Sequence, residues 1–103
     1  MSDLRIANTI AQQIGGKAFF LMGTRQKIGT SNSLIFDIRG SKKANKIEIT
    51  LEPSDTYRID FYKNKRVKKF FPPESIRVHT SDDIYFDMLH EVIERNTGLY
   101  LSL

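Results

Sequence analysis

Apolar residues recur at helical spacing near the start of the chain. Ile6, Ile10 and Ile14 repeat every four residues, and two glycines, Gly15 and Gly16, follow them. A stripe at this period predicts an amphipathic helix. The glycines predict where it ends, because glycine adopts the left-handed terminal conformation at little cost.

A second helical stripe lies near the end of the chain, at Tyr85, Met88, Leu89, Val92 and Ile93. The segment Thr80-Ser81-Asp82-Asp83 predicts the start of this helix, since a capping hydroxyl and acidic residues suit the positive end of its dipole. Gly98 predicts its end. The tail after Gly98 is too apolar to stay in water, so we expect it to pack back on the body of the protein.

Between the two helices the pattern changes to the short period of β-strands. Ile47, Ile49 and Leu51 alternate with polar residues, which is typical of a strand with one buried face. An apolar run at 18–22 suits a strand covered on both sides. Four or five consecutive strands with tight connections predict an antiparallel meander. The expected strands are 18–22, 34–38, 46–52, 57–62 and 67–71, with a long hairpin loop at 23–33, a hairpin loop at 63–66 and a connector at 74–80.

These elements predict an α+β fold formed by a single domain spanning residues 1–103. The order is α-β-β-β-β-β-α, with both helices packed on one face of a twisted antiparallel sheet. The helix–sheet–helix order also resembles the double-stranded-RNA-binding fold, which has three strands and a basic start to its last helix. Here that start is Asp82-Asp83, which argues against this fold.

The composition indicates in which cellular compartment the protein is expected. The chain has no cysteine, which excludes disulfides and thiolate metal sites and suits a reducing compartment. Its first residues lack the apolar stretch of a signal peptide. No apolar run approaches the roughly 20 residues of a membrane span, so we expect an intracellular protein without a membrane partner.

The sixteen Lys and Arg residues outnumber the twelve Asp and Glu residues, and the position of the cations matters more than the net charge of +4. In a meander the second–third and fourth–fifth connections lie at the same end of the sheet. The cations in and beside these connections are Arg39, Lys42, Lys43, Lys46, Lys63, Lys65, Arg66, Lys68 and Lys69. The predicted loop at 23–33, with Arg25 and Lys27, falls at the opposite end.

Two interpretations of this basic end compete. The cations can bind the phosphates of DNA or RNA, and the neighbouring aromatic residues Tyr62, Phe70 and Phe71 suit the stacking of single-stranded bases. Alternatively, lysines occupy loops and edge strands because they keep such segments soluble.

Catalytic and cofactor sites find little support. Asp87, His90, Glu91 and Glu94 share one side of the second predicted helix, but a single imidazole without an HExxH pattern fits a solvated acidic face better than a metal or acid/base site. The glycine-containing loop at 23–31 lacks a Gly-Lys-Ser/Thr ending and precedes a strand, unlike a phosphate-binding loop. We therefore expect no enzyme activity, no metal and no cofactor.

Three segments resemble a family of small phage and prophage-type proteins of unassigned function. They are 6–16, 51–57 and a third segment that starts with 85–89 and runs to 97–103. The resemblance implies a viral or mobile-element origin and a location in the host cytoplasm. It carries no catalytic residues, and the basic end is not among the matching segments.

The sequence therefore predicts a non-enzymatic phage or mobile-element accessory protein that contacts nucleic acid through its basic end. The alternatives are a protein-interaction module, such as an inhibitor of a host factor that uses the acidic helix face or the apolar tail, and a virion or assembly component. The pattern leaves open the identity of a host or phage protein partner and the oligomeric state.

Overall fold

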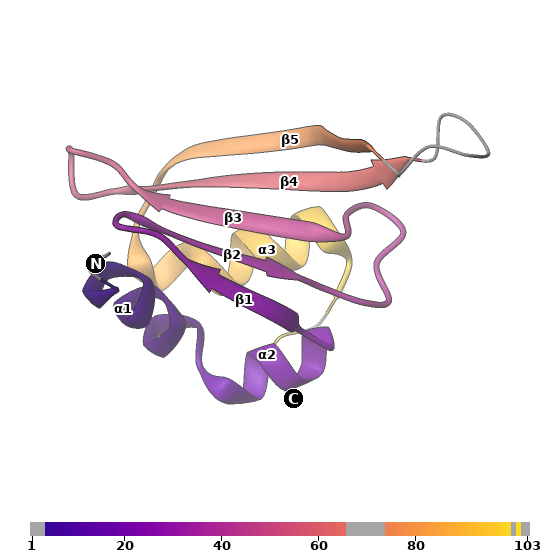
Figure 1. Cartoon of the computed structure of the whole chain (residues 1–103), viewed down its shortest axis with the longest axis horizontal. Coiled ribbons are helices and arrows are strands. Elements are labelled where there is room, and N and C mark those ends of the chain that lie inside the picture. Colours follow the sequence, from indigo (N-terminus) through magenta and orange to yellow (C-terminus); the bar gives the residue numbers. More distant parts are fainter. Residues whose placement is uncertain (1–3, 66–73, 100, 102–103) are drawn as a thin grey trace.

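The computed structural model describes residues 4–65, 74–99 and 101 (Figure 1). Within these residues, helices precede and follow a sheet. The elements in chain order are α1 (Arg5–Ile14), α2 (Gly16–Met22), β1 (Arg25–Gly29), β2 (Ser33–Asp37), β3 (Lys46–Leu51), β4 (Tyr57–Lys65), β5 (Glu74–Ile84), the 3-10 turn η1 (Phe86–Met88) and α3 (Leu89–Thr97).

The described strands form one antiparallel sheet in the order β1-β2-β3-β4-β5, so the predicted meander and the α+β class are confirmed. The register pairs Ile47 with Phe61 and Ile49 with Ile59, and all four side chains are buried. Their neighbours in the alternation, such as Glu48, lie on the other face. One face of the sheet is therefore apolar and the other polar, as is common for antiparallel sheets.

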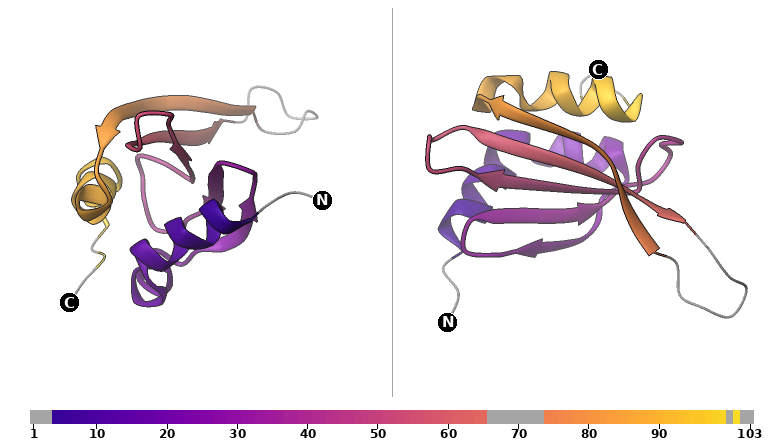
Figure 2. Two further views of the ribbon diagram at one scale, coloured as in Figure 1. Left: turned by 90° about the vertical axis from the view of Figure 1, so that its left-hand side faces the viewer. Right: turned by 90° about the horizontal axis from the view of Figure 1, so that it is seen from above.

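The helices cover the apolar face, and the polar face is open (Figures 1 and 2). Ile10 and Ile14 of α1 and Ile93 of α3 join the strand residues in one core cluster. Leu101 is 1% exposed and belongs to the same cluster, so the prediction that the tail packs back is confirmed for this residue. Gly98 ends α3 in the left-handed conformation with φ 74°, as predicted.

The prediction of a strand at 18–22 is wrong, because these residues lie in α2. Ala18, Phe19 and Met22 are buried, and this spacing is that of one helix face. Phe20 lies on the solvent side of the helix. A short apolar run does not distinguish a strand from a buried helix, and the strand was inferred from the run alone.

The first strand of the sheet is instead β1, which lies inside the predicted loop at 23–33. It is an edge strand, and its residues from Arg25 to Ile28 are exposed. Its pairing with β2 shifts register between these two residues, and Gln26 adopts a positive φ of 51°. An exposed, bulged edge strand carries no alternating apolar pattern from which it could be predicted.

Three predictions near the last strand are also wrong. The connector at 74–80 and the predicted helix start at Thr80–Asp83 both belong to β5, and β4 extends through residues 63–65, which were predicted as a hairpin loop. Asp83 adopts a positive φ of 56°. The pairing of β5 with β4 shifts register at the same place, between Tyr57 and Ile59 of β4, so the polar residues 81–83 form an irregular part of an edge strand. The predicted strand at 67–71 lies outside the described residues.

Among the described residues, no helix is long and apolar enough to cross a membrane.

At Gly29, β1 lies close to α1 and to the residue that precedes this helix. A Cβ atom built at Gly29 would lie 2.8 Å from the Cβ of Ala7 and 3.1 Å from a methyl carbon of Leu4, whereas one built at Gly16 meets nothing within 4 Å. We expect Gly29→Ala to lower the free energy of unfolding by about 1–3 kcal/mol through overpacking. Gly16→Ala, the matched control, should be neutral or slightly stabilising. Urea unfolding measures both, and equal effects would contradict the predicted contact with α1.

Candidate nucleic-acid interface

One end of the sheet carries a concentration of cations from several segments, which we call the basic end. At this end lie the β2–β3 connection, the start of β1 and the C-terminal end of α2. The basic end comprises Arg25, Arg39, Lys42, Lys43, Lys46 and Lys63.

Five of the nine cations predicted for this end lie there with described side chains. Arg39, Lys42 and Lys43 are exposed in the β2–β3 connection, Lys46 begins β3, and Lys63 lies near the end of β4. The Lys63 ammonium donates a hydrogen bond of 2.7 Å to the carbonyl oxygen of Lys42, which ties β4 to the β2–β3 connection. Of the other four, Lys65 ends β4 with a side chain that is not described. Arg66, Lys68 and Lys69, like Phe70 and Phe71, lie outside the described residues.

Arg25 also belongs to the basic end, so its predicted position at the opposite end is wrong. The reason is the shift of the first strand from 18–22 to β1. Arg25 begins β1 and pairs with Asp37 at the end of β2, next to the β2–β3 connection. Lys27 lies two residues further along the same strand, where its ammonium sits 4.6 Å from the centre of the Phe19 ring.

Next to the basic end, further polar and charged residues lie in a row across the open face of the sheet, as the strand register shows. Directly paired residues share a face, so one cross-strand row follows from the pairing alone. The row runs Arg25, Asp37, Lys46, Tyr62 and Arg77, one residue from each strand. Three cations, an aromatic ring and a single acid thus line the sheet beside the basic end.

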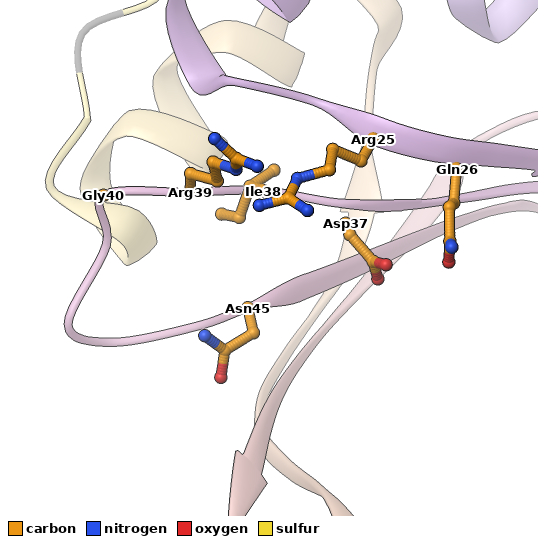
Figure 3. A pocket seen from close by; sticks show the side chains of 7 residues that line it. All are labelled: Arg25, Gln26, Asp37, Ile38, Arg39, Gly40 and Asn45. Carbon is orange, nitrogen blue, oxygen red and sulfur yellow. The ribbon is translucent and has the colours of Figure 1, made fainter.

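A shallow pocket of about 600 Å³ opens where this row meets the β2–β3 connection (Figure 3). Its lining residues are Arg25, Gln26, Asp37, Ile38, Arg39, Gly40 and Asn45. The two arginines come from different segments. The backbone N–H of Arg39 donates a hydrogen bond of 2.9 Å to the carbonyl oxygen of Met22, which fixes the β2–β3 connection against the end of α2.

Further from the basic end, the cations of the open face are paired with acids. Asp60 is 2% exposed on this face, where it accepts a hydrogen bond of 2.6 Å from the Thr80 hydroxyl and one of 3.3 Å from Arg58. Arg77 lies 3.9 Å from the same carboxylate, and Arg58 also contacts Glu52 at 3.1 Å. The charges of Asp60 and Glu52 raise the pKa of Arg58.

Tyr62 is anchored within this polar face. Its hydroxyl donates a hydrogen bond of 3.2 Å to Glu48, and burial, followed by the charge of Glu48, raises the pKa of the phenol. The hydroxyl therefore stays protonated at neutral pH. The half-buried ring lies in the cross-strand row between Lys46 and Arg77.

The cations of the basic end differ from those of the rest of the molecule. Among the residues whose side chains the structure describes, Arg58, Arg77 and Arg95 form ion pairs with acids, and none of these pairs involves a member of the basic end. Asp37 is the one acid that the strand register places among these cations. Cations of like sign repel one another, so their excess over acids costs free energy that an anionic ligand would offset.

The two histidines have structural partners. His90 donates from Nε2 to the carbonyl oxygen of Ile14 at 2.6 Å and so satisfies a terminal carbonyl of α1. His79, predicted in a connector, lies in β5, where its ring contacts Phe61 at 5.9 Å between centres and its Nε2 lies 3.0 Å from the Ser81 hydroxyl. No three His, Asp or Glu side chains among the described residues are grouped to hold a metal ion.

The strand prediction for 18–22 also hid Phe20, which lies beside Arg25, Lys27 and Arg39 in a second pocket of about 410 Å³. The sequence did contain a signal for this position, namely two adjacent phenylalanines, Phe19 and Phe20, shortly after a glycine pair. If this segment is a helix, only one of the two rings can face the core. Comparison with known proteins adds nothing to this geometry, because no protein-family model, curated protein or solved structure matches the chain.

Proposed function

We propose that this protein is a non-enzymatic nucleic-acid-binding protein whose basic end contacts phosphates. The observation that supports this function best is the gathering of unpaired cations from separate segments. Arg25, Arg39 and Lys46 come from β1, the β2–β3 connection and β3, and they lie together without an ion pair among the described residues.

Phosphate binding suits this arrangement for two reasons. Each Lys or Arg that neutralises a phosphate releases condensed counterions, which favours binding at low and moderate salt. The arginines at the edge of the first pocket also present planar groups that can bind phosphate oxygens in pairs. Binding of this kind reads the charge of the backbone and not the base sequence.

The competing interpretation, that lysines occupy loops and edge strands because they keep such segments soluble, accounts for Lys42 and Lys43 in a connection and for a cation such as Arg25 on the edge strand β1. It does not explain why these cations gather at one end of the sheet without an ion pair, whereas Arg58 and Arg95 elsewhere carry acidic partners. The alternative of a protein-interaction module that uses the apolar tail is weakened, because Leu101 is buried in the core. An origin in a phage or mobile element stays a prediction, and so does a role in virions.

The test neutralises two cations of the basic end in Lys42→Ala/Lys43→Ala. Binding to a fluorescently labelled oligonucleotide should weaken by about tenfold or more at moderate salt, and the salt slope, d log Kobs/d log[salt], should fall in magnitude by about 1–2, because each lost phosphate contact removes about 0.7–0.9. Fluorescence anisotropy over a range of salt concentrations measures both.

The matched control is Lys17→Ala/Arg95→Ala, which removes the same charge from exposed positions on α2 and α3. It should leave the affinity within about twofold of the wild type, since neither residue belongs to the basic end. Equal losses in the two variants would show that only net charge matters and would overturn the proposed surface.

A further inference from the structure

The most exposed of the large apolar side chains in the described part of the chain is Phe20, at 83%. The preceding residue, Phe19, is buried and contacts Phe36 edge to face at 5.3 Å. The helix α2 therefore commits one phenyl ring to the core and holds the next one in solvent, where it contributes little to folding. Its position next to the basic end gives it a different use.

The surroundings of Phe20 define what we call the Phe20 corner: Phe20, Thr24, Arg25, Lys27 and Arg39, which line the second pocket with Phe19 and Gly23. Its cations come from β1 and from the β2–β3 connection. The contact of Lys27 with the Phe19 ring holds one ammonium at the pocket.

One further detail concerns the walls of this pocket. A Cβ atom at Gly23 would lie 3.2 Å from the Cβ of Arg39, so the end of α2 and the β2–β3 connection pack closely and hold the pocket walls in place.

An exposed aromatic ring among unpaired cations has the chemistry of a single-strand binding site. The ring stacks on the face of an unpaired base, and the cations hold the adjoining phosphates. In a duplex the base faces are already stacked on one another, so the ring has no face to contact.

We infer that the Phe20 corner binds single-stranded nucleic acid by stacking an unpaired base on Phe20, with Arg25, Lys27 and Arg39 on the neighbouring phosphates. This inference rests on the proposed function, since it gives the basic end a substrate class. It also assigns different tasks to the two parts of the surface. Lys42, Lys43 and Lys46 bind backbone charge on any strand, and the corner distinguishes single strands from duplexes.

The chain contains no tryptophan, so Phe20→Trp introduces a single indole reporter. An oligothymidine of about 16 nucleotides should quench its fluorescence as bases stack on the indole, whereas the same oligonucleotide in a duplex should not. The matched control is Phe86→Trp, which places the reporter on η1, 64% exposed at the far end of the sheet. Its fluorescence should stay unchanged.

A companion measurement separates this inference from the proposed function. Fluorescence anisotropy with labelled single strand and duplex should show that Phe20→Ala weakens single-strand binding by about tenfold and leaves duplex binding unchanged. Equal affinity of Phe20→Ala and wild type for both probes, or equal quenching at the two tryptophan positions, would overturn the stacking site alone. Absence of binding to either probe at low salt would overturn the proposed function as well.

Discussion

Phe19→Ala lowers the free energy of unfolding by about 3–5 kcal/mol, whereas Phe20→Ala changes it by less than about 0.5 kcal/mol. The two residues are adjacent and chemically identical, and only their positions on α2 differ. Phe19 is 6% exposed and packs on Phe36, while Phe20 is 83% exposed. Since a domain of this size is stable by about 5–15 kcal/mol, the first change removes a large fraction of its stability.

Urea unfolding monitored by circular dichroism gives both values, with the slope m showing whether the unfolded states are comparable. The comparison also tests the secondary structure of 16–22. In a strand covered on both sides the two rings would both be buried, and the two substitutions would cost similar amounts. Similar costs would therefore contradict the helix.

Removing four cations from two segments should have the largest effect on binding. Arg25→Ala/Arg39→Ala and Lys42→Ala/Lys43→Ala should each reduce the magnitude of the salt slope for single strands by about 1.4, and the fourfold variant by about 3. Extrapolated from 1 M salt, this corresponds to about a thousandfold loss of affinity at 0.1 M.

The sum of the two effects on the salt slope is informative, because Arg25 lies on β1, whereas Arg39, Lys42 and Lys43 lie in the β2–β3 connection. If all four contact one ligand, their effects on the slope add. If the fourfold variant binds single strands as tightly as Lys42→Ala/Lys43→Ala, the two arginines make no contact with the ligand, and the four cations do not form one binding surface. Circular dichroism of each variant verifies that the fold is kept.

The parts of the fold that were predicted correctly are those where one face is buried. The stripe from Ile6 to Ile14 became α1, and the alternation around Ile47 and Ile49 became β3, because a partly buried element leaves its period in the sequence. The segment β4 was predicted for the same reason. Gly98 was correctly predicted to end a helix, because glycine adopts the left-handed backbone conformation at a helix C-terminus at little cost.

The edges of the sheet could not be predicted in this way. β1 has four exposed residues in a row and β5 is exposed from Ile76 to Thr80, so neither shows a buried side. In β5 the polar run Ser81–Asp83 imitates a helix cap, although its residues complete a strand with an irregular register. Local sequence does not distinguish these two uses of serine and aspartate.

How well the candidate site could be predicted depended both on the elements with one buried face and on the edge strands. Lys42, Lys43 and Lys46 were assigned to one end because the strands on either side, β2 and β3, were predicted correctly. Arg25 was assigned to the wrong end because moving the first strand reverses which end of the sheet its start occupies. Phe20 was missed for the same reason, since a strand gave it no exposed position.

The salt dependence of wild-type binding to a single-stranded oligonucleotide tests the central claim most directly. If the basic end neutralises phosphates, log Kobs falls linearly with log[salt], with a slope of magnitude about 3 or more for at least four contacts. Undetectable binding at the lowest salt concentration, or an affinity that does not change with salt, would contradict the claim that this end of the sheet binds nucleic acid.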